Sequence, residues 1–157
     1  MSSFSPAKNS DVERSTDKEA SSIDGGMSDA QTESGDGDDE EKRVLITGAG
    51  GFIGSHVADF LLGRGDKVII VDEMNDYYDV RLKNANIEYL YSKHGDKCVM
   101  YQGDICDAEF MKKLWDTESP THVCHLAARA GVRPSIVDPY IYVHSNIEGK
   151  KKEHIFN

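Results

Sequence analysis

The chain has 157 residues, a length that suits one domain, and a formal net charge of -10. Residues 1–41 hold twelve acids and three bases, whereas the remainder holds sixteen acids and fifteen bases. The nearly neutral remainder has no basic stripe of the kind that grips phosphate backbones, so we expect no nucleic-acid partner.

The hydropathy pattern argues against a membrane protein. No apolar run approaches the ~20 residues of a membrane-spanning helix. The first residues are polar and acidic, and they do not resemble a signal or transit peptide. We therefore expect a soluble, cytoplasmic protein with no membrane partner.

Residues 1–41 differ in composition from everything that follows. They are rich in Ser, Asp, Glu and Gly, and Phe4 is their one aromatic residue. Such a segment cannot bury enough apolar area to offset the entropy lost on ordering. We predict a disordered acidic tail over 1–41 and an ordered domain over 42–149.

Strand and helix patterns alternate through the predicted domain. Short β-rich or apolar runs predict strands over 42–47, 67–72, 97–105 and 121–128. Helix patterns cover 52–65, 80–93, 108–116 and the segment from 138 onward. This alternation indicates an α/β protein with parallel strands and right-handed crossovers.

Two of the predicted helices carry specific local signals. In the first, Ile53, Val57, Phe60 and Leu61 recur at the spacing of one helix face, and Gly63 and Gly65 follow as end signals. The last begins with Asp138 as a capping residue and Pro139 at its first position.

A glycine-rich turn joins the first strand to the first helix. Gly48 allows a tight turn, Gly51 lets backbone approach a pyrophosphate, and Gly54 lets helix and strand pack closely. The amino end of the helix then faces the anion with free N–H groups and its positive dipole end. We predict an NAD(P)-binding Rossmann fold, as a partial doubly wound parallel sheet of about four strands.

The end of the second strand bears on the choice of dinucleotide. Asp72 lies eighteen residues after Gly54, where a carboxylate accepts both ribose hydroxyls of the adenosine half. Glu73 beside it repels a 2′-phosphate, and the next arginine is Arg81. The charge pattern favours NAD over NADP.

The glycine spacing in "TGAGGFIG" resembles the extended short-chain dehydrogenase/reductase family. "GDI" at 103–105 and "HLAA" at 125–128 stand where that family has its third- and fourth-strand motifs. Within the family, "NDYYDVRLK" and "AARAGVRPSIVDPYIYVHSNIEG" are similar to UDP-glucuronate 4-epimerases. The resemblance runs from Arg43 to Gly149 and covers an N-terminal part of such an enzyme.

The resemblance implies roles for individual residues. The pyrophosphate would lie along Gly48, Gly51, Phe52, Ile53 and Gly54. Asp72 and Asn75 would bind the adenosine ribose, Asp104 and Ile105 would flank the adenine, and Ala127, Ala128 and Arg129 would lie along the cofactor. Gly131, Val132, Arg133 and Ser135 would form a loop that faces the sugar. Arg133 would pair with a uronate carboxylate, with a surface salt bridge as the alternative.

The family's chemistry is a transient oxidation at C4 of the sugar, served by a tyrosine and a lysine four residues later. That pair belongs after a fifth strand, which we do not find, so we assign no catalytic residue. Tyr89 and Lys93 have the right spacing but lie on the predicted 80–93 helix, which favours a solvent-facing pair. Residues 150–157, "KKKEHIFN", depart from the family pattern.

Three functions remain open. The chain is the NAD-binding part of a UDP-glucuronate 4-epimerase, or a catalytically inactive fragment that binds NAD or pairs with a full-length subunit, or part of a sugar-nucleotide dehydratase or decarboxylase. The first implies a UDP-sugar substrate and a homodimer for the parent enzyme.

The cysteines Cys98, Cys106 and Cys124 are odd in number and form no C-x-x-C pair, so we expect reduced thiols. His122 and His125 flank Cys124 and raise the question of a metal site. We favour a buried strand there, because no second ligand cluster accompanies the three residues.

Overall fold

The structure is a computed structural model that describes residues 41–149. The acidic tail predicted over 1–41, apart from its last residue, lies outside the described residues, and so does the segment 150–157 that was predicted to depart from the family pattern. The domain boundaries at 42 and 149 therefore stay predictions.

A four-stranded parallel sheet with the strand order β3-β2-β1-β4 forms the centre of the fold. Ile46 in β1 is paired with Ile70 in β2 on one side and with Cys124 in β4 on the other. The strands are β1 (Arg43–Thr47), β2 (Lys67–Asp72), β3 (Cys98–Gln102) and β4 (His122–His125). All four strands lie within the predicted segments.

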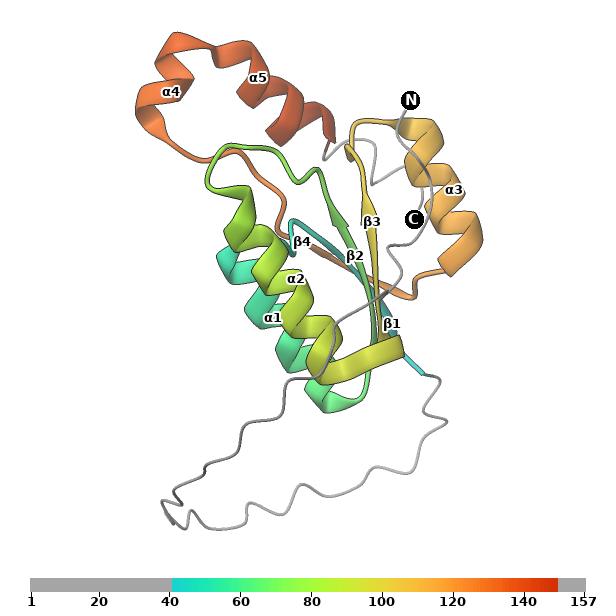
Figure 1. The fold of residues 1–157 in the computed structure, drawn as a ribbon. Helices are drawn as coiled ribbons and strands as arrows, with labels where there is room; N and C mark the ends of the chain where they lie inside the picture. The colour runs from blue at the N-terminus through green and yellow to red at the C-terminus, as the bar shows by residue number, and fades with distance from the viewer. Residues whose placement is uncertain (1–40, 150–157) are drawn as a thin grey trace, which may run out of the picture.

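The helices cover the sheet from both sides. Figure 1 shows α1 (Phe52–Arg64) and α2 (Val80–His94) on one face and α3 (Ala108–Glu118) on the other. This division follows from right-handed crossovers: the chain runs outward from β1 to β3 and then returns across the sheet to β4. A 3₁₀ turn, η1 (Gly95–Lys97), leads from α2 into β3.

Each face of the sheet has its own apolar core. On the side of α1 and α2, the buried side chains include Ile46, Ile70 and Leu90. On the side of α3, they include Leu45, Ile69 and Leu114. Successive residues of β1 and β2 thus alternate between the two cores, as expected for strands covered on both faces.

Of the four apolar residues predicted on one face of the first helix, Val57 and Leu61 pack against the core, whereas the other two do not. Ile53 and Phe60 are 65% and 69% exposed, and the residues that α1 buries are the smaller Gly54, Ser55, Ala58 and Leu62. A Cβ at Gly54 would lie 2.4 Å from the Gly48 carbonyl oxygen, so the helix approaches the preceding turn more closely than larger side chains permit. The close approach of α1 to the preceding turn, and not the apolar periodicity, thus decides which residues the helix buries completely. Gly65 ends α1 at φ +109, whereas Gly63 lies inside the helix.

The segment after β4 also differs from the prediction. The expected loop at 131–135 forms a short helix, α4 (Val132–Val137). It is followed by α5 (Pro139–Val143) and a π-helical turn, η2 (His144–Glu148). Asp138 caps α5 as predicted, because its carboxylate accepts from the Ile141 N–H at 3.4 Å.

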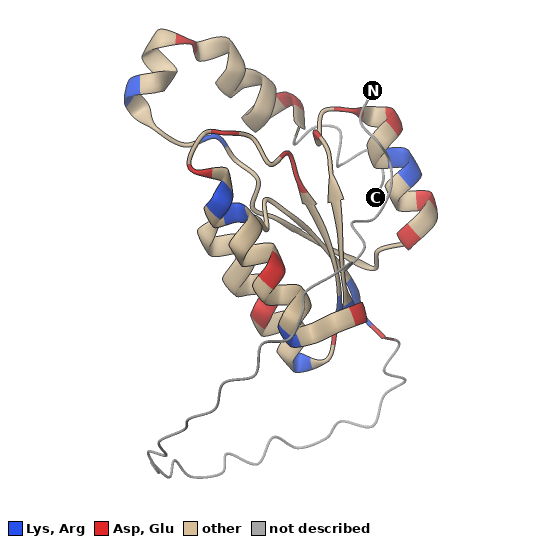
Figure 2. Cartoon of the chain, in the orientation of Figure 1, with Lys and Arg blue, Asp and Glu red and all other residues tan. Residues whose placement is uncertain are grey.

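Charged side chains of both signs are spread over the described elements, and Figure 2 shows basic and acidic residues close together along α3. Among residues 41–149, no helix combines the length and the apolar character needed to cross a bilayer. Cys98, Cys106 and Cys124 are present as thiols.

Candidate cofactor-binding site

The site is built on the turn between β1 and α1. Gly48 has φ +77, a region that favours glycine, and its N–H donates to the Val71 carbonyl at 2.7 Å. A Cβ at Gly48 would lie 2.7 Å from the backbone of Ala127. The turn is therefore packed directly against the end of β2 and the segment that follows β4.

The amino end of α1 meets the requirements of an anion site. Gly51 is its N-cap, no side chain caps it, and no acid occurs in its first turn. The first N–H groups of a helix have no partner within the helix, and the helix dipole adds positive charge at that end. A phosphate is the kind of group that such an end binds.

Asp72, at the end of β2, is held from three directions. One oxygen, Oδ2, accepts from the Gly50 N–H at 2.9 Å. The other, Oδ1, accepts from the Met74 N–H at 2.8 Å and from Lys83 Nζ at 3.2 Å. The residue is only 7% exposed, so its carboxylate has a fixed orientation at the carboxyl edge of the sheet. Gly50 is required here, since a Cβ would lie 2.8 Å from Oδ2.

Lys83 is a site residue that the sequence reasoning missed. It reaches from α2 to Asp72, and its Nζ also donates to Asn75 Oδ1 at 3.1 Å. Lys83, Ile87 and Leu90 share the buried face of α2. A lysine on the apolar face of a helix was the available signal, since a buried lysine needs a partner.

The opposite wall is formed by the segment after β3. Asp104 Oδ1 accepts from the Cys106 N–H at 2.8 Å, and Oδ2 faces His144 Nε2 at 3.3 Å. Burial alone would raise the pKa of Asp104, but the hydrogen bonds from Cys106 and His144 outweigh it and lower the pKa. Hydrogen bonds to Glu148 and then to Asp104 raise the pKa of His144.

Two tyrosines, one after β2 and one on α5, bind the same carbonyl on the β4 side of the site. The hydroxyl of Tyr77 donates to the Ala130 carbonyl, and the hydroxyl of Tyr142 donates to the same oxygen at 2.9 Å. Asn146 accepts from the Arg129 N–H at 2.8 Å and donates to its carbonyl at 3.0 Å. These bonds fix the backbone of 129–130 beside the glycine turn.

On the β2 side, the Tyr78 hydroxyl donates to the Gly50 carbonyl at 3.2 Å. Burial, and secondarily the charge of Asp72, raises the pKa of Tyr78. Sequence reasoning gave no role to Tyr77, Tyr78 or Tyr142. Nothing in the local pattern distinguishes them from surface tyrosines.

A cavity of 390 Å³ lies between the segments that carry these groups. Every residue that the sequence predicted for the cofactor lines it: Gly48, Gly51, Phe52, Ile53, Gly54, Asp72, Asn75, Asp104, Ile105, Ala127, Ala128 and Arg129. Other lining residues include Tyr77, Tyr78, Lys83 and Ser145. Segments that are 15 or more residues apart in sequence thus converge at the carboxyl edge of the sheet, where open α/β sheets bind ligands.

Two predicted substrate residues lie elsewhere. Arg133 and Ser135 are on α4 and do not line the cavity, and the Ser135 hydroxyl donates to the Val132 carbonyl at 2.7 Å. Tyr89 and Lys93 also lie outside the cavity lining, paired with each other at 2.9 Å and with Asp59 on α1.

The arrangement defines a Rossmann-type α/β protein with a cavity at the switch point of its sheet. A solved UDP-glucose 4-epimerase from Stenotrophomonas maltophila, with bound NAD and formylated UDP-arabinopyranose, has the same fold, with a TM-score of 0.65 at 32% identity. The match covers 74% of this chain and 33% of that chain.

The family model described as GDP-mannose 4,6 dehydratase matches residues 45–152. The chain therefore belongs to this family, within the extended short-chain dehydrogenase/reductases. The predicted fold class and family are confirmed.

Individual relatives point to a more specific group than the family model does. UDP-glucuronate 4-epimerase 4 of Arabidopsis thaliana is 51% identical over 106 residues, which are 68% of this chain and 24% of that protein. UDP-glucuronate 4-epimerase of Thermodesulfobacterium geofontis is 47% identical over 105 residues, 67% of this chain and 32% of that protein. The chain thus spans only 24% and 32% of the length of these two relatives.

Proposed function

We propose that the chain is the NAD-binding part of a nucleotide-sugar epimerase that acts on UDP-glucuronate. One observation carries the proposal: all twelve residues expected to contact the cofactor line a single cavity. The relatives of similar sequence are UDP-glucuronate 4-epimerases, and a structural neighbour was crystallised with NAD. The activity, the UDP-sugar substrate, the homodimer and the cytoplasmic location of the whole protein are part of this proposal.

The residues present fit NAD. The uncapped amino end of α1 receives the pyrophosphate, Asp72 receives the adenosine ribose, and Asp104 accepts from the adenine amine. When bound, NAD accepts a hydride reversibly. Asp72 is pre-oriented by Gly50, Met74 and Lys83, so little reorganisation accompanies ribose binding.

Two cations lie near the expected position of the adenosine ribose, so the preference for NAD over NADP depends on whether either could bind a 2′-phosphate. Lys83 neutralises Asp72 at 3.2 Å, and Arg129 approaches Glu73 at 4.0 Å. Both cations already have carboxylate partners in the site, so neither is a ready receptor for a 2′-phosphate. The proposed cofactor is therefore NAD and not NADP.

Arg133 keeps its proposed role toward the uronate carboxylate in the whole protein, because a guanidinium forks onto planar oxyanions. It is exposed on α4, so the surface role also stands. Replacing Arg133 with Lys in the whole enzyme should raise KM for the uronate more than for a neutral sugar nucleotide. A uniform effect on both would favour the surface role.

Isothermal titration of the full chain with NAD tests the cofactor assignment. Replacing Asp72 alone would leave Lys83 buried without its charge partner, so the informative variant is Asp72→Asn with Lys83→Met. It should bind NAD roughly tenfold more weakly, because a hydrogen bond to a charged group is lost. Asp76→Asn, in the same loop but outside the cavity lining, should bind as the parent does.

Equal affinity in all three proteins would remove Asp72 from the ribose role. A folded chain that takes up no NAD would overturn the proposal. A 4,6-dehydratase or decarboxylase is the second candidate, since the matching family model carries a dehydratase description.

Incubation with UDP-glucuronate separates the enzyme from a pure binding module. No tyrosine–lysine pair four residues apart lines the cavity within residues 41–149, so we expect no UDP-galacturonate from the chain alone. Turnover would contradict this expectation.

A further inference from the structure

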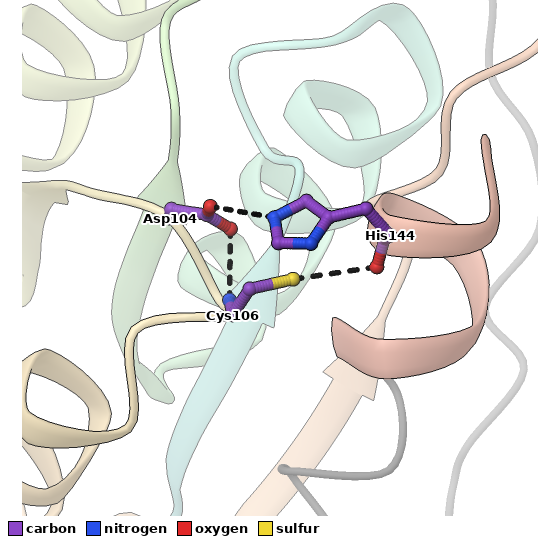
Figure 3. A group of neighbouring side chains, drawn as sticks. All are labelled: Asp104, Cys106 and His144. Atoms are coloured by element: carbon purple, nitrogen blue, oxygen red, sulfur yellow. Dashed lines mark hydrogen bonds and ion pairs between the residues drawn. The ribbon is translucent and has the colours of Figure 1, made fainter. Parts of the chain in front are cut away.

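A compact group of potential metal ligands lies beside the cavity, at the junction of β3 and η2. Asp104 and Cys106 follow β3, and His144 opens η2 (Figure 3). One ligand atom from each of the three side chains lies within 4.8 Å of the other two. Within the part of the chain that the structure describes, this is the one such group of three.

The chemistry of the group is that of a zinc-type site. Imidazole nitrogen, thiolate sulfur and carboxylate oxygen are the three ligand types of Zn²⁺ in proteins. The sulfur argues against Mg²⁺ and Ca²⁺, which take oxygen ligands. Three protein ligands leave one tetrahedral position open to water or another ligand.

The distances are close to those of a bound ion. Asp104 Oδ2 and His144 Nε2 are 3.3 Å apart. Two ligands at about 2.1 Å from a tetrahedral ion are themselves about 3.4 Å apart. The thiol of Cys106 now donates to the His144 carbonyl at 3.3 Å, so its sulfur already lies on the His144 side. A side-chain movement of about an ångström brings it into the coordination sphere.

The surroundings orient two of the ligands. His144 Nδ1 lies 2.9 Å from a carboxylate oxygen of Glu148, one helical turn later. Metal-binding histidines almost always donate their second N–H to a carboxylate, carbonyl or water, which leaves the other nitrogen for the metal. Asp104 is fixed in turn, because its other oxygen accepts from the Cys106 N–H.

The histidines around Cys124 are not arranged in this way. His122 Nδ1 lies 2.9 Å from Thr121 Oγ1, and His125 Nδ1 lies 2.8 Å from Thr47 Oγ1. The sequence drew attention to this triplet because its members are adjacent. It missed the other group because Cys106 and His144 are 38 residues apart.

We propose that Asp104, Cys106 and His144 bind a zinc-type divalent cation, with Glu148 positioning His144. On binding, the thiol proton of Cys106 and the proton on His144 Nε2 leave to solvent, and sulfur and nitrogen each donate an electron pair to the ion. The ion replaces the direct Asp104–His144 contact.

The proposal has a consequence that rests on the proposed function. Asp104 and Ile105 line the cavity, and Asp104 is the expected acceptor for the adenine amine. A cation on Oδ2 occupies that acceptor. The metal and NAD should therefore weaken each other's binding by the same factor.

Cobalt titration of the reduced 157-residue chain tests the site directly. Co²⁺ should produce a thiolate-to-cobalt absorption band that saturates at one equivalent and is abolished by Zn²⁺. The acidic segment 1–41 contains neither Cys nor His, so it cannot produce this band. Cys106→Ser and His144→Gln should lose the band, and Glu148→Gln should weaken binding roughly 10- to 100-fold.

Matched controls are Cys124→Ser and His56→Gln, which should keep the band. His144 is 49% exposed, so His144→Gln is informative even where Cys106→Ser fails to fold. The absence of a band in the parent chain would overturn the site. A band that persists in His144→Gln or disappears in Cys124→Ser would overturn it too.

NAD titration with and without one equivalent of Zn²⁺ tests the consequence. Zn²⁺ should weaken NAD binding roughly tenfold, since one charge-assisted hydrogen bond is lost. A cobalt band with unchanged NAD affinity would support the metal site and refute the competition. A cobalt band without any NAD binding would refute the proposed function and leave the metal site standing.

Discussion

The central strands and the helical segment after β4 use the same kinds of apolar side chain in opposite ways. Leu45 and Ile46 in β1 have no accessible surface, whereas Ile136 and Val137 on α4 are 78% and 87% exposed. α4, α5 and η2 bury no residue at all. The two regions thus have different roles. The sheet supplies most of the buried apolar area that stabilises the fold, and the later segment contributes to the geometry of the site through a few polar contacts.

The difference shows what each region needs in order to fold. The sheet is sandwiched between two apolar cores that bury nearly all of β1 and β2, whereas the edge strand β4 stays partly exposed. The later segment is connected through the tyrosine contacts to Ala130 and through Asn146 and Arg129. Its apolar residues have no comparable core within residues 41–149.

The largest expected effect concerns the buried ion pair of the pocket. Lys83→Ala should lower the free energy of unfolding by about 4 kcal/mol, because it leaves the buried Asp72 carboxylate without its counter-ion. Lys112→Ala removes an exposed partner of Asp116 and should change stability by no more than about 0.5 kcal/mol. Urea denaturation followed by circular dichroism measures both, and similar values would contradict the contrast.

The next test compares the two regions directly. Leu114 lies on the buried side of α3, in the core between this helix and the sheet. Leu114→Ala should lower the free energy of unfolding by about 3 kcal/mol through lost burial and cavity formation. Ile136→Ala, on exposed α4, should stay within about 0.5 kcal/mol. A large loss from Ile136→Ala would mean that α4 packs against something in solution, and the comparison of the two regions would then fail.

A third test separates close packing from helix propensity within α1. Gly54→Ala should destabilise by about 2 kcal/mol, because its Cβ would lie 2.4 Å from the Gly48 oxygen. Gly63→Ala, in the same helix, meets nothing within 4 Å and should stabilise by about 0.5 to 1 kcal/mol. Thermal melts should therefore shift in opposite directions. A shared direction would refute the explanation for the buried face of α1.

The smallest effect is a pH dependence at the contact of α1 and α2. Hydrogen bonds from His94 and then Lys93 lower the pKa of Asp59, against the effect of burial. Tyr89 also faces this carboxylate, at 3.5 Å. Since the folded pKa lies below the unfolded one, the contribution is present above about pH 3.8 and is lost as the pH falls through the folded pKa. The urea midpoint should fall less on acidification in Asp59→Asn than in the parent, and identical profiles would exclude the effect.

The strands and the glycine turn could be predicted because their signals are local. Apolar runs in β1 and β2, the spacing of Gly48, Gly51 and Gly54, and Asp72 at the end of β2 all lie within about 30 residues. All twelve predicted cofactor residues then line one cavity, since parallel strands bring their carboxyl ends to one edge of the sheet.

The differences from the prediction arose where contacts between elements, and not the local pattern, decided the outcome. α1 packs closely through Gly54 and leaves Ile53 and Phe60 exposed, and short helical turns formed where a loop was expected around Arg133. Lys83 was missed because its partner, Asp72, belongs to another element.

The sequence by itself thus determined the order of elements, the parallel sheet and the turn that faces the cavity. These follow from periodicity and from the backbone freedom of glycine, which act over short stretches of chain. Only the tertiary structure decided which side chains meet: Lys83 with Asp72, Tyr142 with Ala130, and His144 with Asp104 and Cys106. Such contacts depend on how the crossovers place separate elements, and no local pattern encodes that placement.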